Sequence, residues 1–194
     1  MADDPRDLEA LGQALGDLYR TTDEARRRDW DRSLSPEEML SDRWERARRL
    51  GFGDRASIYA SALVYGDMAV GPESWIGPWV LLDGSGGSLR IGAFCSISAG
   101  VQVYTHDTVG WALSGGELDH RVGPVEIGDN CHIGSQSIVV AGVTVGSRCV
   151  VGANSLVNRD VPDRTVVAGS PARPIGRVEG EGADVRLVFD DGGG

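Results

Sequence analysis

Residues 127–161, IGDNCH IGSQSI VVAGVT VGSRCV VGANSL VNRDV, repeat with a period of six. Each hexad begins with an aliphatic residue, glycine most often follows it, and the fifth position is small or compact. Successive members of such a column lie about 600° apart around a helix, so they would wind over its surface. Short strands joined by sharp corners keep them on one inward line. The stretch therefore predicts a β-solenoid of hexapeptide repeats.

The aliphatic column also runs backward from residue 127, with two interruptions. Its earlier members are Ile58, Val64, Val70, Ile76, Leu82, Ile91, Ile97 and Val103. The first interruption holds the glycine-rich run GSGG at 84–87, and the second is the long segment 104–126, which does not keep the hexad. Long loops in compact folds usually carry function, so we expect the second interruption to do so here.

The composition limits the possible partners of the protein. The 194 residues carry a formal net charge of −10, with a sequence pI near 4.7. This acidity disfavours binding to nucleic acid or to an anionic membrane surface. No run approaches the roughly 18 apolar residues of a membrane span, and the first residues lack the pattern of a secretory signal. We therefore expect a cytoplasmic protein.

All three cysteines fall in the fifth position of a hexad. Cys95, Cys131 and Cys149 should therefore face the interior, where a free cysteine behaves as a small hydrophobic residue. Their odd number and wide spacing argue against a disulfide framework or a CxxC metal site, so no metal is expected.

Helical signals are confined to the first fifty residues. Leu8, Leu11, Leu15 and Leu18 recur at helical spacing, and a capping box at Ser35 predicts a second helix that ends near Gly51. We therefore expect an N-terminal helical segment over 1–52, a hexapeptide β-helix over 53–165 with a protruding loop at 104–126, and a C-terminal extension with a flexible tail over 166–194. The helices could cap the open end of the solenoid, pack on a neighbouring subunit or shape acceptor specificity.

Three pieces of the chain resemble the hexapeptide-repeat acyltransferases, a family that includes galactoside and maltose O-acetyltransferases and sugar N-acetyltransferases. The pieces are the repeats, YTHD at 104–107 and VVAGSPARPIGRV at 166–178. The resemblance implies a mainly β chain folded as a left-handed parallel β-helix and assembled as a homotrimer. It also implies an acetyltransferase that uses acetyl-CoA to acylate a hydroxyl or amino group of a small molecule, most naturally a sugar or nucleotide sugar.

Acyl transfer to a hydroxyl or amino group requires a group that accepts a proton as the acceptor attacks. Histidine suits this task near neutral pH, and the chain contains His106, His120 and His132. His106 begins the long excursion and matches the loop histidine that acts as general base in the resembling family, so we expect it to be catalytic. Its other ring nitrogen could be oriented by Asp107, Glu117, Asp119 or a backbone carbonyl.

The resemblance also suggests residues for the two substrates. In this family the pantetheine arm lies along the C-terminal coils, and the matching cofactor-binding candidates are Ser135, Ala153, Asn158, Arg159 and Arg173. Asp83 and Trp111 are the candidates for binding the acceptor, as a carboxylate and as a stacking surface for a sugar ring.

Two other functions remain open from the sequence. A γ-carbonic anhydrase-like enzyme uses the same fold with three interfacial histidines on zinc. That class requires two histidines about five residues apart and a distant third, whereas the histidines of this chain are 14 and 12 residues apart. A non-catalytic solenoid used for assembly or ligand binding would need neither the loop histidine nor the GSPAR ending.

Overall fold

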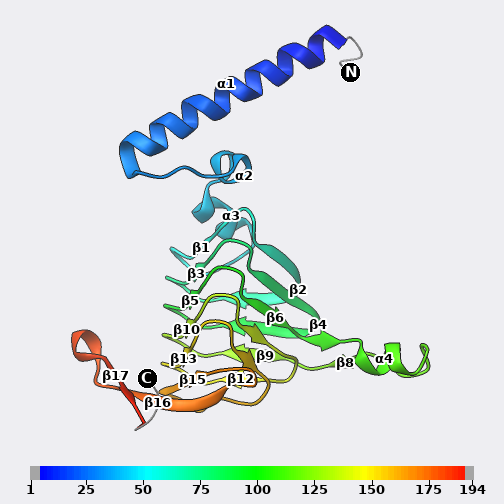
Figure 1. Ribbon diagram of the computed structural model, residues 1–194, viewed down its shortest axis with the longest axis vertical. Coiled ribbons are helices and arrows are strands. Elements are labelled where there is room, and N and C mark those ends of the chain that lie inside the picture. The colour runs from blue at the N-terminus through cyan, green and yellow to red at the C-terminus, as the bar shows by residue number, and fades with distance from the viewer. Residues whose placement is uncertain (1–4, 191–194) are drawn as a thin grey trace. The chain divides into compact units, whose positions relative to one another are not determined.

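The computed structural model describes residues 5–190, so residues 191–194 of the expected flexible tail lie outside it. The chain divides into two compact units, residues 1–42 and residues 43–194 (Figure 1). Within the described residues, no helix is both long enough and apolar enough to cross a membrane.

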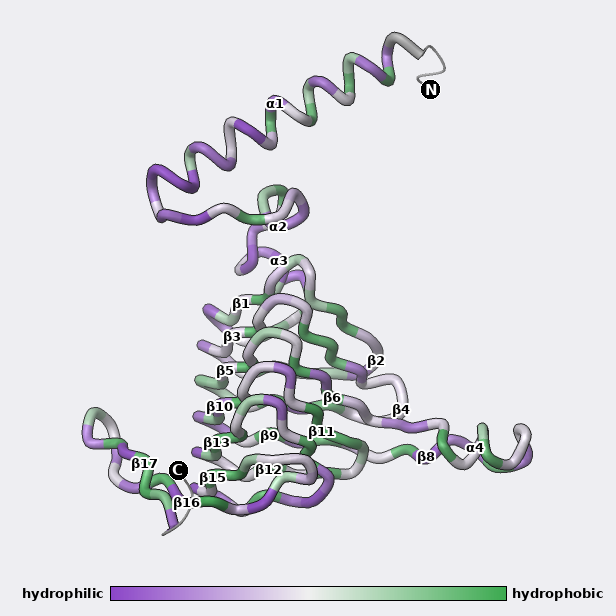
Figure 2. The backbone as a smooth tube through the Cα atoms, viewed as in Figure 1, coloured by the Kyte–Doolittle hydropathy of each residue, from purple (hydrophilic) through white to green (hydrophobic). Residues whose placement is uncertain are grey.

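The first unit contains α1 (Pro5–Trp30) and α2 (Pro36–Leu40). The leucines of the predicted first helix lie on α1, and Figure 2 shows hydrophobic and hydrophilic residues alternating along it. The single second helix predicted from Ser35 to near Gly51 is wrong. The backbone is extended at Ser41, and a separate helix, α3 (Arg43–Arg49), follows in the second unit. Ser41 and Asp42 are residue types that favour helix starts over helix interiors, which explains the break.

The second unit is the predicted solenoid, a left-handed parallel β-helix with α3 packed on its first strand. Its strands are β1 (Ser57–Ile58), β2 (Leu63–Val70), β3 (Trp75–Ile76), β4 (Leu81–Ile91), β5 (Ser96–Ile97), β6 (Gln102–Tyr104), β9 (Val125–Ile127), β10 (His132–Ile133), β11 (Ile138–Val139), β12 (Thr144–Val145), β13 (Val150–Val151), β14 (Leu156–Val157) and β15 (Thr165–Ala168). Each pairs in parallel with strands one coil away, as Ile133 does with Ile97 and Val151. The parallel register stacks the hexad columns.

The aliphatic column forms the core. Apart from the partly buried Val64, every aliphatic residue of this column (an anchor of the core) from Ile58 to Val157 is at most 4% exposed. Full burial of one such side chain contributes about 1.5–3 kcal/mol. The three cysteines are buried and free, which confirms their predicted inward position.

At the corners of the solenoid, the second and fourth positions of the hexad meet two different steric requirements. The left-handed backbone conformation falls on the fourth residue of the hexad, as at Asn130, Gln136, Arg148 and Asn154. The glycine of the second column serves a different purpose, since a Cβ on Gly134 would lie 2.5 Å from the backbone nitrogen of Ala153 on the next coil. The glycine column therefore reflects close approach between coils, and polar residues tolerate the left-handed turns.

The segment after β6 leaves the coils, as predicted, and extends sideways in Figure 1. It contains β7 (His106–Asp107), α4 (Val109–Leu113) and β8 (Arg121–Val122), and β7 pairs antiparallel with β8. After the solenoid, β15, β16 (Arg173–Glu179) and β17 (Arg186–Phe189) form an antiparallel extension, with the short helix η1 (Gly182–Asp184) between the last two.

Candidate active site

The register of the solenoid brings Asp83 and His106 together. β4 and β6 pair in parallel with Asp83 opposite Tyr104, so the start of the excursion lies over the end of the previous coil. The Nδ1 atom of His106 lies 3.5 Å from the Oδ2 atom of Asp83. The Asp83 side chain is 12% exposed and the His106 side chain 28%. A largely buried carboxylate thus faces one ring nitrogen of a histidine that solvent can reach.

The Asp83 carboxylate is itself held by hydrogen bonds. Ser85 donates to its Oδ1 atom twice, from Oγ at 2.5 Å and from the backbone nitrogen at 2.9 Å. The Ser85 Oγ atom also lies 3.5 Å from Nδ1 of His106. These bonds fix the carboxylate on the side of the imidazole.

The buried Thr105 connects the two chain segments. Its hydroxyl donates to the backbone oxygen of Asp83 at 2.8 Å and accepts from the backbone nitrogen of Gly86 at 3.0 Å. A Cβ on Gly86 would lie 2.5 Å from the Cβ of His106. Gly86 is therefore needed for the backbone to pass beside the histidine, which gives the GSGG run a role in shaping this site.

Two further rings lie near His106 on the excursion. The His106 and His120 rings stack with centroids 6.4 Å apart, and the Trp111 ring meets His120 edge-on at 6.1 Å. His120 and Trp111 are exposed. His106, His120 and Trp111 thus form an aromatic surface beside the buried carboxylate.

The acidic residues of the excursion have other positions. Asp107 lies 3.9 Å from Arg121 and accepts from the backbone nitrogen of Val109 at 3.1 Å. Glu117 and Asp119 are exposed. Of the carboxylates named here, Asp83 is the one that lies against the histidine ring. Ser85, Thr105 and Gly86 are not among the residues predicted for the site, and their signal in the sequence is only their place in or beside the two interruptions of the hexad.

The five cofactor-binding candidates are exposed and lie outside the His106 cluster. Ser135 and Ala153 occupy one corner on successive coils, since Asn154 donates to the backbone oxygen of Ser135 at 2.8 Å. Asn158 and Arg159 follow β14, at the corner where β6 also ends. Arg173 opens β16 opposite Ala168. The structure therefore places them on the later coils.

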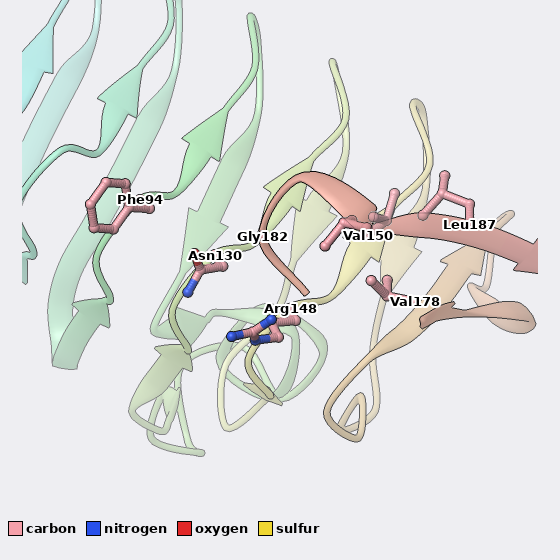
Figure 3. A pocket seen from close by; sticks show the side chains of 8 residues that line it. Phe94, Asn130, Arg148, Val150, Val178, Gly182 and Leu187 are labelled. Atoms are coloured by element: carbon pink, nitrogen blue, oxygen red, sulfur yellow. The ribbon is translucent and has the colours of Figure 1, made fainter. Parts of the chain in front are cut away.

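A separate hollow of about 500 Å³ lies between the solenoid and the C-terminal hairpin (Figure 3). Its lining is mostly apolar, with Phe94, Val150 and Leu187 on its walls and Arg148 at its edge. It contains neither His106 nor any of the predicted site residues. It holds no group suited to accept a proton from a substrate, so we place the candidate site at His106.

Burial keeps the cysteines from offering an alternative nucleophile, although the hydrogen bond with Cys131 lowers the pKa of Cys149 to about 7. Each thiol donates to a backbone carbonyl of the neighbouring coil, as Cys131 does to Gly146 at 2.9 Å. Hydrogen bonds with the Cys149 and Cys95 thiols, together with burial, raise the pKa of Cys131 well above its usual range. Between residues 5 and 190, no group of three or more His, Cys, Asp or Glu side chains is placed to hold a metal ion.

The comparisons with known proteins agree with the repeat and the fold. A family model described as the hexapeptide repeat of succinyl-transferase matches residues 124–159. The protein CapG of Staphylococcus aureus is 43% identical over 95 residues, which cover 47% of this chain and 54% of CapG. The chain thus spans about half the length of this curated relative, and half or less of the next ones.

Two solved structures extend the comparison beyond the repeats. The hexapeptide-repeat-containing acetyltransferase VCA0836 of Vibrio cholerae O1 biovar eltor, complexed with acetyl coenzyme A, is 25% identical, covers 91% of each chain and has a TM-score of 0.50. The N-acyltransferase AntD of Bacillus cereus, in complex with dTDP and 3-hydroxybutyryl-CoA, is 26% identical with a TM-score of 0.55. That match covers 68% of this chain and 86% of AntD.

Proposed function

Since this chain resembles the hexapeptide-repeat acyltransferases in its repeat and its fold, we propose that it transfers an acetyl group from acetyl-CoA to a hydroxyl or amino group of a sugar or nucleotide sugar. The observation that carries the proposal is the pair formed by His106 and the buried Asp83 at the mouth of the excursion. A histidine oriented by a buried carboxylate is an arrangement suited to a general base.

In the proposed reaction the acceptor oxygen or nitrogen attacks the thioester carbonyl directly. His106 takes the acceptor proton as the new C–O or C–N bond forms, the C–S bond breaks, and the proton is then given to the departing thiolate. Asp83 holds the Nδ1–H of the ring, so that the other ring nitrogen is the base, and it stabilises the imidazolium while it exists. The 3.5 Å separation is expected to shorten once the acceptor is bound.

The acyl donor is expected to lie along the later coils. Ser135 and Ala153 leave room for an extended arm, and Asn158, Arg159 and Arg173 offer hydrogen bonds and positive charge to amide and phosphate oxygens. Because these residues occupy different corners of one solenoid, we expect the groove to be completed by a neighbouring subunit in a homotrimer. The backbone amide of Ser135, an exposed residue, is a candidate donor to the tetrahedral oxyanion.

The acceptor is expected to rest against the aromatic surface of the excursion. Trp111 and His120 offer flat aromatic faces of the kind on which sugar rings stack, and His120 lies next to the proposed base. In this arrangement Asp83 serves the base, so its expected role moves from binding the acceptor to orienting His106. The AntD complex contains dTDP, which supports a nucleotide-linked sugar as one class to test.

A screen of sugars, amino sugars and nucleotide sugars with acetyl-CoA tests the proposal. Coenzyme A release should rise with one class of acceptor and stay at background with the others, and mass spectrometry of the product should show one added acetyl group on oxygen or nitrogen. If the protein bound no acetyl-CoA and acetylated none of the acceptors, the result would contradict the proposal and favour a non-catalytic solenoid.

A further inference from the structure

The leucine stripe of α1 has no sufficient partner inside its own unit. The four leucines at 8, 11, 15 and 18 are each between 49% and 58% exposed. Among the described side chains from residue 7 to residue 42, only Glu38 and Met39 are buried. A long helix of this kind usually gains its stability from an apolar face packed against something else. The unit as it stands leaves most of that face in water.

The spacing of the stripe indicates what kind of surface covers it. The four leucines follow one another at steps of three, four and three residues, and the same register reaches the polar Thr22 and the small Ala25 with steps of four and three. This alternation averages 3.5 residues, the period at which two or more helices supercoil around one another. A strand or a flat sheet imposes no such period. The stripe therefore fits another helix.

The surroundings of the stripe favour an identical helix. The positions that flank Leu11, Leu15 and Leu18 are uncharged, namely Gly12, Ala14, Tyr19 and Thr21. Asp7 beside Leu8 is the one acid among these flanking positions, so two copies of α1 would meet little repulsion along this seam. The charged Glu9 and Asp17 lie on the far side, and Asp17 pairs with Arg20 there. A seam with so little charge can face a second copy of itself and does not call for a partner of opposite sign.

Gly12 is a second and independent observation. A Cβ built on Gly12 would meet nothing within 4 Å, and its backbone is not in the left-handed region. The fold of this chain therefore does not require a glycine there, although glycine is unfavourable inside a helix. A second backbone approaching closely beside the stripe would explain it.

The unit also contains a recess that suits a leucine from another helix. Leu15 and Leu18 of α1, with Met39 and Leu40 of α2, line an apolar hollow of about 200 Å³. Leu40 is largely exposed. We propose that α1 is a self-association helix, whose leucine stripe packs against α1 of another copy of this chain. This inference does not depend on the proposed enzymatic function.

Disulfide crosslinking of the full-length chain tests this contact. Leu15→Cys alone reports a parallel pair, and a mixture of Leu11→Cys with Leu15→Cys reports an antiparallel one. Under mild oxidation, at least one of the two should yield a covalent dimer on a non-reducing gel. Gln13→Cys, on the polar face of the same turn, should yield no more dimer than the unsubstituted chain, whose three cysteines are buried. Dimer yields that do not exceed that of Gln13→Cys would overturn the proposal.

A charge substitution provides a second measurement that does not rely on cysteine. Leu11→Glu combined with Leu15→Glu should lower the helical circular dichroism signal and make α1 a site of rapid proteolysis, while the solenoid keeps its β signal. The matched control, Ala10→Glu with Gln13→Glu, adds the same charge at two exposed positions off the stripe and should change neither. If helicity fell in the leucine variant but no crosslink formed at positions 11 and 15, the stripe would be packing on its own chain, and self-association would be refuted.

Discussion

At the level of single residues, the site depends on how the Asp83 carboxylate is held against His106. The Asp83→Asn variant keeps the shape and one acceptor oxygen for Ser85 but loses the negative charge that stabilises an imidazolium. We expect kcat to fall roughly 10- to 10³-fold. This loss is smaller than the loss of the base itself, because general-base catalysis as a whole contributes about 10²–10⁴-fold. Asp107→Asn, which removes a carboxylate exposed beside Arg121, should stay near the unsubstituted rate.

Equal losses in the two variants, or an Asp83→Asn enzyme with unchanged kcat, would show that Asp83 does not position the base. The melting temperature of each variant distinguishes a lost charge from a lost fold, because the amide oxygen introduced by Asp83→Asn can still accept the Ser85 hydrogen bonds.

The fifth position of the hexads permits a matched test of the core. The Cys131 thiol donates to Gly146, and the hydroxyl of Ser137, one hexad later, donates to Gly152 at 2.8 Å in the same way. Cys131→Ser should therefore be tolerated, whereas Cys131→Ala should lose the bond and leave a small void, at a cost on the order of 1 kcal/mol. Denaturant unfolding measures both. A turnover loss in a stably folded Cys131→Ala protein would argue that the thiol has a chemical role.

At the level of elements, the C-terminal hairpin of β16 and β17 depends on surface charge. The hydrogen bond from Arg177, and after it the one from Arg186, lowers the pKa of Glu179 below its ordinary value. A carboxylate with a lowered folded pKa stabilises the folded form above its unfolded pKa, and that contribution is lost as the pH falls through the folded value. Amide exchange in β17 should therefore accelerate relative to the solenoid below about pH 4.5, the ordinary value for this group.

Glu179→Gln removes the titrating group and should abolish that difference between pH 4 and pH 7. The same acceleration in the Gln variant would assign the effect to other carboxylates. Because Glu179 is on the surface, the effect is expected to be local and weakened by salt.

Much of the solenoid could be predicted from the hexad column, because each anchor is set by the requirement that an aliphatic side chain point inward once per face. The pairing of Asp83 with His106 could not be predicted in the same way. It depends on how the GSGG bulge and the excursion align β4 with β6, and both segments break the count of six. The break between α2 and α3 was missed because helical propensity alone does not decide between one helix and two.

At the scale of the whole molecule, the proposed donor groove needs more than one subunit. Light scattering should give a mass of three 20.6 kDa chains, or a multiple of three if α1 joins trimers to one another. A mass of one, two or four chains would contradict the homotrimer and would require the cofactor-binding candidates to act within a single solenoid.

The central claim is that His106 removes the acceptor proton, and single-turnover and steady-state kinetics of His106→Ala test it most directly. We predict that kcat falls about 10²- to 10⁴-fold while acetyl-CoA affinity, measured by calorimetry, stays near that of the unsubstituted protein. The acid limb of the kcat/KM profile should also disappear, because no imidazole remains to be protonated there. A His106→Ala enzyme that retained the unsubstituted kcat and the same pH profile on its acceptor would contradict the account.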